Sequence, residues 1–172
     1  VQKFGAGAVS TEHERRQVRV LHLIAAYRNR GHQVAKLDPL GLMEREDVPD
    51  LELAHHGLSP ADLDTVFQTG NLFIGKPEAT LREIVDCLQT TYCSSVGAEY
   101  MHIVNTAEKR WLQQRMEGVR CHPEYGKDIK GHILERLSAA EGLEKYLGSK
   151  YPGTKRFGLE GGESLIPLMD EM

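Results

Sequence analysis

Helix-start signals that recur along this chain constrain its fold more than any other feature. In a capping box, two polar side chains three residues apart each satisfy a free backbone N–H of the other residue. The pairs with this spacing are Thr11–Glu14, Thr80–Glu83 and Asn105–Glu108. Apolar residues follow each pair at the spacing that places them on one face of a helix. The sequence therefore predicts a mainly α fold.

The expected helices cover 11–31, 80–91, 105–117 and 129–146. Gly31 is a plausible left-handed stop for the first helix. We expect Trp111, with Leu112 and Met116, to form the buried face of the third helix. The last region is interpreted as one or two helices, broken near Gly142.

The segments between these helices lack a regular apolar period. Residues 32–58 contain two prolines and are expected to form a loop-rich connection. Ser59-Pro60 has the pattern of a cap followed by proline at the first helical position, which predicts a short helix there. Residues 70–77 are expected to be irregular.

Composition narrows the class of protein. Of 172 residues, 40% are hydrophobic and 27% are charged, and the formal net charge is −4. The basic residues are scattered among acids, which argues against nucleic-acid binding. There is no run of eighteen apolar residues to span a membrane. Three cysteines without a C-x-x-C pair favour a reducing compartment.

A cluster of basic groups is the main site candidate that the residues themselves suggest. Arg28, Arg30, His32 and Lys36 lie around the expected C-terminus of the first helix, and the first three are the candidate contact residues. One interpretation is a favourable interaction with the helix dipole. The other is contact with an anion or an acidic partner. We predict no metal site, because Cys121-His122 has no second ligand pair nearby, and no hydrolase or nucleotide-binding motif is present.

The segment from Lys150 to Met172 differs in character from the rest of the chain. It contains a basic pair, an aromatic residue, a glycine-bounded turn and an apolar run. An apolar run at a chain end has nothing to pack against within its own segment. We expect this segment to be the start of a larger domain, and the chain to be a fragment.

Four sequence blocks, taken together and in order, resemble one enzyme family. The blocks are residues 23–41, 91–103, 108–115 and 137–172. They are similar to the N-terminal part of the decarboxylating component of the 2-oxoglutarate dehydrogenase complex, a thiamine diphosphate-dependent enzyme. The resemblance covers nearly the whole chain from residue 15 onward.

The resemblance implies a division into three parts. Residues 1–10 would be a flexible tail, 11–148 a helical N-terminal region, and 149–172 the truncated first elements of a thiamine diphosphate-binding α/β domain. It also implies that Phe157, Leu159 and Glu160 border the active site. Gly158 departs from the family, which usually has serine there, so any polar contact of that serine would be lost.

The activity that the resemblance implies belongs to a longer parent protein. That protein would oxidatively decarboxylate 2-oxoglutarate and transfer the succinyl group to lipoamide in the tricarboxylic acid cycle. It would use thiamine diphosphate and magnesium, whereas this chain contains none of the family's catalytic residues and is expected to bind neither.

The implied partners are a second copy of the parent, as a homodimer, and the dihydrolipoyl succinyltransferase core, with no nucleic acid and no membrane. A bacterial cytoplasm is expected, or else a mitochondrial matrix. Two alternatives stay open at this point. One is the related 2-oxoadipate dehydrogenase component, and the other is a stand-alone helical interaction module.

Overall fold

The computed structural model describes residues 7–155 and 158–171. It divides the chain into two compact units, 1–123 and 124–172. The mainly α prediction is confirmed, since helices dominate both units. Within the described ranges, no helix is both long and apolar enough to cross a bilayer.

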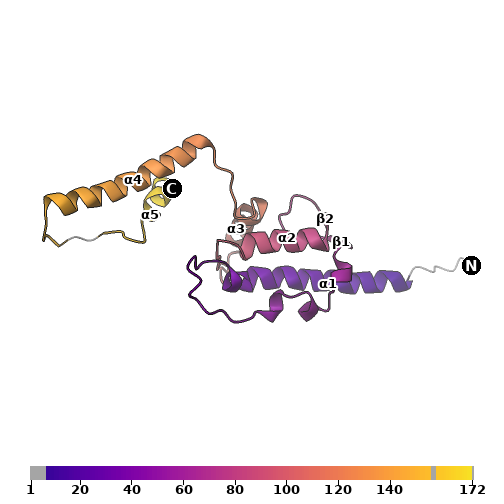
Figure 1. The fold of residues 1–172 in the computed structure, drawn as a ribbon. Coiled ribbons are helices and arrows are strands. Elements are labelled where there is room, and N and C mark those ends of the chain that lie inside the picture. The colour runs from indigo at the N-terminus through magenta and orange to yellow at the C-terminus, as the bar shows by residue number, and fades with distance from the viewer. Residues whose placement is uncertain (1–6, 156–157, 172) are drawn as a thin grey trace, which may run out of the picture. The chain divides into compact units, whose positions relative to one another are not determined.

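The first unit contains three α-helices and a two-stranded sheet. The helices are α1 (Gly7–Arg30), α2 (Leu81–Tyr92) and α3 (Thr106–Gly118). The strands β1 (Val66–Gln68) and β2 (Glu78–Thr80) pair antiparallel, with Phe67 opposite Ala79. Short 3-10 helices lie at Gly31–Val34, Pro49–Leu51, Ala54–His56 and Pro60–Asp62. Figure 1 shows α1 and α2 running side by side.

The core of the first unit lies between α1 and α2. Both helices bury residues spaced three and four apart, which is the pattern of one apolar face. The fully buried apolar residues of these faces include Val20, Leu23, Ile24, Leu81, Ile84 and Leu88. Phe67 of β1 closes the same cluster. The apolar face expected after Thr80 is therefore confirmed in α2. In α1, helical spacing from Val20 and Ile24 also favoured Leu21 for the buried face, but Leu23 is buried there and Leu21 is exposed.

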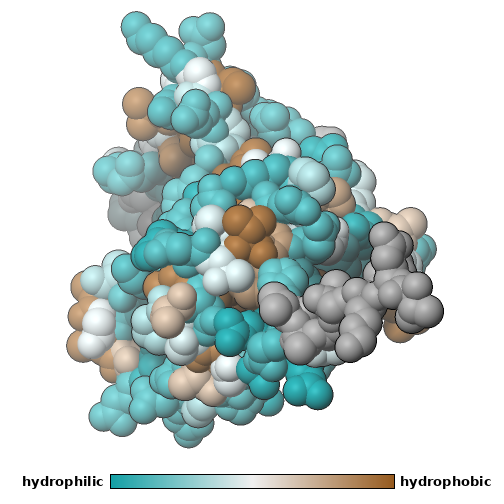
Figure 2. All heavy atoms as spheres, turned by 90° about the vertical axis from the view of Figure 1, so that its right-hand side faces the viewer, coloured by the Kyte–Doolittle hydropathy of each residue, from teal (hydrophilic) through white to brown (hydrophobic). Residues whose placement is uncertain are grey.

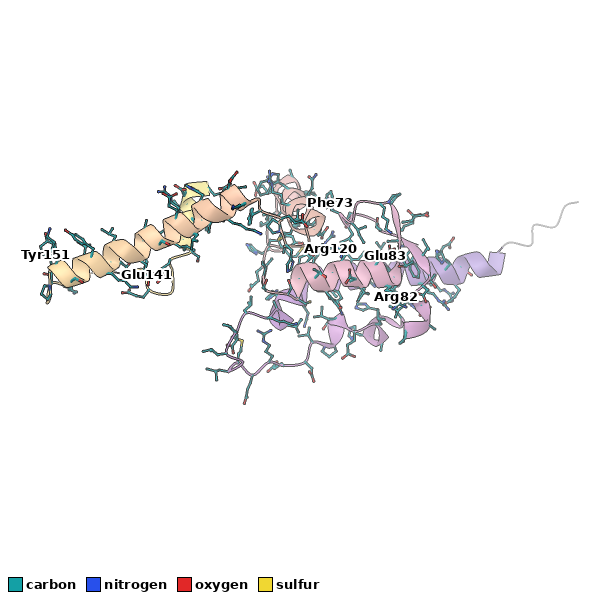
Figure 3. All side chains as sticks on the ribbon, turned by 45° about the horizontal axis from the view of Figure 1, so that its top comes forward. Phe73, Arg82, Glu83, Arg120, Glu141 and Tyr151 are labelled. Carbon is teal, nitrogen blue, oxygen red and sulfur yellow. The ribbon has the colours of Figure 1, made fainter. Side chains whose placement is uncertain are left out.

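The capping box that opens α2 forms as predicted. The backbone N–H of Thr80 donates to Glu83 Oε2 at 2.9 Å, and that of Glu83 donates to Thr80 Oγ1 at 3.3 Å. Lys76 Nζ also contacts Glu83 Oε1 at 2.6 Å. The Lys76 ammonium, followed by the Thr80 donors, lowers the pKa of Glu83 to about 2. Figure 3 shows Arg82 and Glu83 at this end of α2.

Three helix boundaries differ from the prediction. The first helix begins at Gly7 instead of Thr11, because no proline interrupts residues 7–10. The helix after Ser59 is a single 3-10 turn, and the chain then enters β1. The region around Gly142 stays helical, since one interior glycine costs only about 1 kcal/mol.

Gly31 has a different role from the predicted left-handed stop. Its φ is not positive, and α1 passes into a 3-10 turn at this residue. A Cβ placed on Gly31 would lie 2.5 Å from Tyr92 Cβ and 3.2 Å from the Tyr92 carbonyl oxygen. Glycine is therefore required here because the end of α1 and the end of α2 approach closely.

Trp111 is exposed, which corrects the prediction that it is buried. Its side chain is 54% exposed, while Gln113 and Glu117 are buried and Leu112 and Met116 are partly buried. At 3.6 residues per turn these four residues share one side of α3, and Trp111 projects from the opposite side. A buried face that includes two polar residues explains why hydrophobicity alone pointed to the wrong side.

The second unit consists of α4 (Lys127–Lys150) and α5 (Leu165–Glu171), which pack on each other. His132 Nε2 lies 2.5 Å from Asp170 Oδ2, and Arg136 lies nearby. No described residue of α4 or α5 is buried. Figure 3 shows Glu141 within α4 and Tyr151 at its end. The assignment of residues 149–172 to an α/β domain stays a prediction.

Gly31→Ala tests the close approach of α1 and α2. The added methyl group must displace the Tyr92 backbone, so we expect a loss of about 1–3 kcal/mol of unfolding free energy, measured by urea denaturation. Gly118→Ala is the matched control, because nothing lies within 4 Å of a Cβ at that helical glycine. Equal unfolding free energies for the two variants would contradict this packing.

The capping box should make the unfolding free energy of the first unit depend on pH in the acidic range. The pKa of Glu83 is about 2 in the folded chain, against an ordinary value of 4.5. Its stabilising contribution is therefore complete above pH 4.5 and is lost as the pH falls toward 2. Glu83→Gln should flatten the fall in unfolding free energy over this window. An unchanged slope would show that the box is not formed in solution.

Candidate functional site

The structure separates the basic residues that the sequence grouped at the end of α1. Arg28 is only 5% exposed and points into the first unit. Its Nε donates to Glu117 Oε1 at 2.7 Å and its Nη2 to Glu117 Oε2 at 3.0 Å. The remaining Nη1 donates to Asn71 Oδ1 at 2.6 Å. Arg28 is therefore engaged internally and does not present a charge to an external anion.

Glu117 is the centre of this network. Besides Arg28, its Oε1 accepts a hydrogen bond from the Tyr92 hydroxyl at 2.7 Å. Its Oε2 accepts one from the backbone N–H of Phe73 at 2.9 Å. Tyr92 in turn contacts the Tyr100 hydroxyl at 2.8 Å. One buried carboxylate thus joins α1, the loop before β2, and the end of α2 to α3.

The ionisable groups of the network stabilise one another's protonation states. Burial alone would lower the pKa of Arg28, but the hydrogen bonds and charge of Glu117 raise it overall. Burial raises the pKa of Tyr92, and the Glu117 carboxylate raises it further. Burial also raises the pKa of Tyr100. Arg28 stays charged and both tyrosines stay protonated at neutral pH, so each remains a donor. This arrangement is suited to holding elements together.

Arg30 and His32 lie nearer the surface. Arg30 Nη1 is 3.4 Å from Asp50 Oδ2, and His32 Nε2 is 3.6 Å from Glu99 Oε1. Each already has an acidic neighbour. The prediction that they contact an anion or a partner stays a prediction, without the third cation that Arg28 was expected to supply.

The predicted active-site border falls in the second unit. Phe157 lies outside the described residues. The backbone N–H of Leu159 donates to Glu144 Oε1 at 2.7 Å, and Glu160 lines a cavity of about 510 Å³. Glu141, Glu144 and Glu163 line the same cavity. Lys145 is the one basic residue in the wall, so the cavity carries a net negative charge, which disfavours a diphosphate that is not accompanied by a cation.

Gly158 tolerates the serine that the family usually has there. Its φ is not positive. The three atoms nearest to a Cβ at this position all belong to the carboxylate end of Glu160, which can rotate away.

A second cavity, of about 670 Å³, lies in the first unit between the end of α2 and residues 45–52. Tyr27 and Cys93 form part of its wall. Burial raises the pKa of Cys93 to about 11, so the thiol is protonated at neutral pH and is a poor nucleophile. No group of three or more His, Cys, Asp or Glu that could hold a metal occurs in the part of the chain that the structure describes.

Sequence reasoning missed Glu117 and its donors. Glu117 was assigned to the expected helix, but a glutamate near a helix end is ordinarily solvated. The useful signal was the spacing of Gln113 and Glu117, four residues apart beside Leu112 and Met116, which places them on one face of α3. The partner Arg28 lies 89 residues away, and no local pattern connects the two.

Comparisons with known proteins identify relatives along nearly the whole chain. A 2-oxoglutarate dehydrogenase E1 component from Azotobacter vinelandii is 63% identical over 171 residues, which are 99% of this chain. The E1 component from Cupriavidus necator is 51% identical over 92% of the chain, and that from Brucella anthropi 44% identical over 99%. The predicted resemblance is confirmed. No family model matches the chain.

The relatives are much longer than this chain. The chain spans 18% of the length of the Azotobacter vinelandii E1 component and 17% of that from Cupriavidus necator. The similarity to 2-oxoglutarate dehydrogenase E1 components therefore concerns less than a fifth of the length of each of these proteins.

Glu117→Gln tests the network. The amide keeps the shape of the carboxylate but leaves the Arg28 charge buried without its counter-ion, so we expect a loss of about 3–5 kcal/mol in the free energy of unfolding. The control is Asp64→Asn, which breaks the exposed pair of Asp64 with Arg82 at 3.0 Å and should cost less than about 1 kcal/mol. Similar small losses for both variants would mean that Glu117 is solvated.

Proposed function

We propose that this chain is the helical N-terminal portion of the decarboxylating component of a 2-oxoglutarate dehydrogenase complex. The observation that carries the proposal is 63% identity to such a component across 99% of the chain. The parent protein would oxidatively decarboxylate 2-oxoglutarate and pass the succinyl group to lipoamide. Thiamine diphosphate, when bound, supplies the electron sink for decarboxylation.

In this proposal the chain itself is a scaffold and does no chemistry. The network around Glu117 ties its helices together. Thiamine diphosphate and magnesium would therefore be held by other parts of the parent, and this chain alone would be inactive.

The proposed partners are a second copy of the parent protein and the dihydrolipoyl succinyltransferase core. The E1 names of the relatives support membership of a multienzyme complex. Their sources, Azotobacter vinelandii and Cupriavidus necator, are bacteria and favour a bacterial cytoplasm as the compartment. The same names specify 2-oxoglutarate, which favours this substrate over 2-oxoadipate.

Carbon dioxide release from the full-length parent tests the proposal. With thiamine diphosphate, magnesium and lipoamide, whose disulfide is reduced as it accepts the four-carbon unit, the parent should release carbon dioxide from 2-oxoglutarate at least about tenfold faster than from 2-oxoadipate, which corresponds to about 1.4 kcal/mol of discrimination. The 172-residue chain should release none from either acid.

Three results would count against it. Faster turnover of 2-oxoadipate would show that 2-oxoadipate, and not 2-oxoglutarate, is the substrate of the parent. Absence of turnover by the parent would reject the enzyme. Turnover by the 172-residue chain would reject its role as a scaffold.

A further inference from the structure

The backbone at the end of α3 has an unusual conformation. On the face shown in Figure 2, hydrophobic side chains form only small separate patches among polar ones. The backbone after α3 is more distinctive, because Arg120 and Cys121 have φ angles of 52° and 53°. Among the residues that the structure describes, these two are the only non-glycine residues with a positive φ. A positive φ is uncommon and strained for a residue with a Cβ atom.

The hydrogen bonds at this helix end form a Schellman motif. The backbone N–H of Cys121 donates to the Met116 carbonyl oxygen at 2.9 Å, and that of Arg120 donates to the Glu117 carbonyl oxygen at 3.2 Å. This pattern places Arg120 directly after the cap residue Val119, at the position where glycine is usually found.

A surface ion pair does not explain the arginine at this position. Arg120 Nη1 donates to Asp86 Oδ2 at 2.7 Å, and Figure 3 shows Arg120 beside α2. The two side chains are 43% and 62% exposed. An ion pair with this exposure contributes little to stability, so the strain at Arg120 must be offset by other interactions.

A glycine that could take the left-handed position without strain lies two residues earlier. Gly118 is the last residue of α3, its φ is not positive, and nothing lies within 4 Å of a Cβ placed on it. If Gly118 adopted a positive φ, the same motif would form with the Val119 N–H on the Gln114 carbonyl oxygen. The helix would then end about 3 Å earlier, without strain at Arg120. The local sequence therefore favours a shorter helix than the observed one.

The buried network opposes this local preference. Glu117 lies in the last turn of the observed helix, is 1% exposed, and accepts hydrogen bonds from Arg28, Tyr92 and the backbone of Phe73. In the shorter form Glu117 would be the cap residue, and its carboxylate would leave its position among these donors. Separating a buried ion pair is strongly destabilising. The network thus selects the longer, strained end of α3.

We propose that the end of α3 is a two-state cap, in which Gly118 and Arg120 compete for the left-handed position. The Arg28–Glu117 pair holds the longer form, and weakening of the pair releases the shorter one. The change reaches His122, whose backbone N–H donates to the Val119 carbonyl oxygen at 2.8 Å.

The consequence of the switch is a change in the wall of a cavity. The His122 side chain lines the cavity of about 670 Å³ beside Tyr27 and Cys93. The cap therefore links the buried ion pair to the shape of this cavity. The inference concerns the first unit alone and does not depend on the proposed function.

Arg120→Val in the 172-residue chain tests the competition, because a β-branched residue strongly disfavours a positive φ. The Cys121 amide is hydrogen-bonded in the longer form, so its hydrogen exchange should accelerate at least about tenfold relative to that of Leu88 in the α2 core. Backbone chemical shifts should report a positive φ at Gly118. Arg120→Gly should have the opposite effect and slow the Cys121 exchange at least about fivefold, since glycine adopts this conformation without strain.

Two further variants separate the cap from its surroundings. Asp86→Asn breaks the same surface ion pair but leaves Arg120 in place, so it should change the Cys121 exchange by less than about twofold. Gly118→Ala removes the alternative cap. Combined with Arg120→Val, it should lower the urea midpoint by more than the two single shifts added together.

Glu117→Gln tests the control by the network, and it should produce the same positive φ at Gly118 as Arg120→Val. The Arg120 variants retain Glu117, so they test the cap even if Glu117→Gln fails to fold. A helical Gly118 in folded Arg120→Val would overturn the inference, as would additive urea shifts in the double variant. Equal acceleration of the Cys121 and Leu88 amides would also overturn it, because the substitution would then unfold the whole unit. An effect of Asp86→Asn as large as that of Arg120→Val would assign the helix end to the surface ion pair.

Discussion

The first unit depends on one buried ion pair, between Arg28 of α1 and Glu117 of α3. Desolvating two charges costs several kcal/mol, and the cost is offset only when their remaining hydrogen-bonding positions are satisfied. Glu117 meets this condition, since it accepts hydrogen bonds from Arg28, Tyr92 and the backbone of Phe73. Because these donors come from different elements, few alternative arrangements of α3 would satisfy the same carboxylate.

This arrangement determines which surfaces are left for function. The side of α3 that carries Gln113 and Glu117 is turned inward, so Trp111 is turned outward. Arg28 is withdrawn from the basic cluster at the end of α1, and Arg30 and His32 remain near acidic neighbours. The first unit thus engages the Arg28 charge internally and leaves Trp111 exposed.

Local features of the fold were predictable from the sequence, and the long-range ones were not. The Thr80–Glu83 box and the apolar stripe of α2 follow from spacing within a few residues. The three-residue strands are too short for a detectable alternation. Gly31 looked like a helix stop because its contact with Tyr92 is 61 positions away in the chain. Trp111 was predicted to be buried because hydrophobicity was the only criterion for choosing the buried side of α3. The buried glutamate Glu117 places the opposite side of the helix inward. The resemblance to 2-oxoglutarate dehydrogenase E1 components was recognisable from four sequence blocks and not from any single motif.

A double-mutant cycle between Arg28 and Glu117 tests the central role of the pair most directly. Arg28→Met, Glu117→Leu and the combined variant would be compared with the wild-type chain by urea denaturation. The account predicts a coupling energy of at least about 2 kcal/mol, with the combined variant losing much less than the two single losses added together. A coupling energy below about 0.5 kcal/mol would contradict it, and would show that α1 and α3 are held together by other contacts.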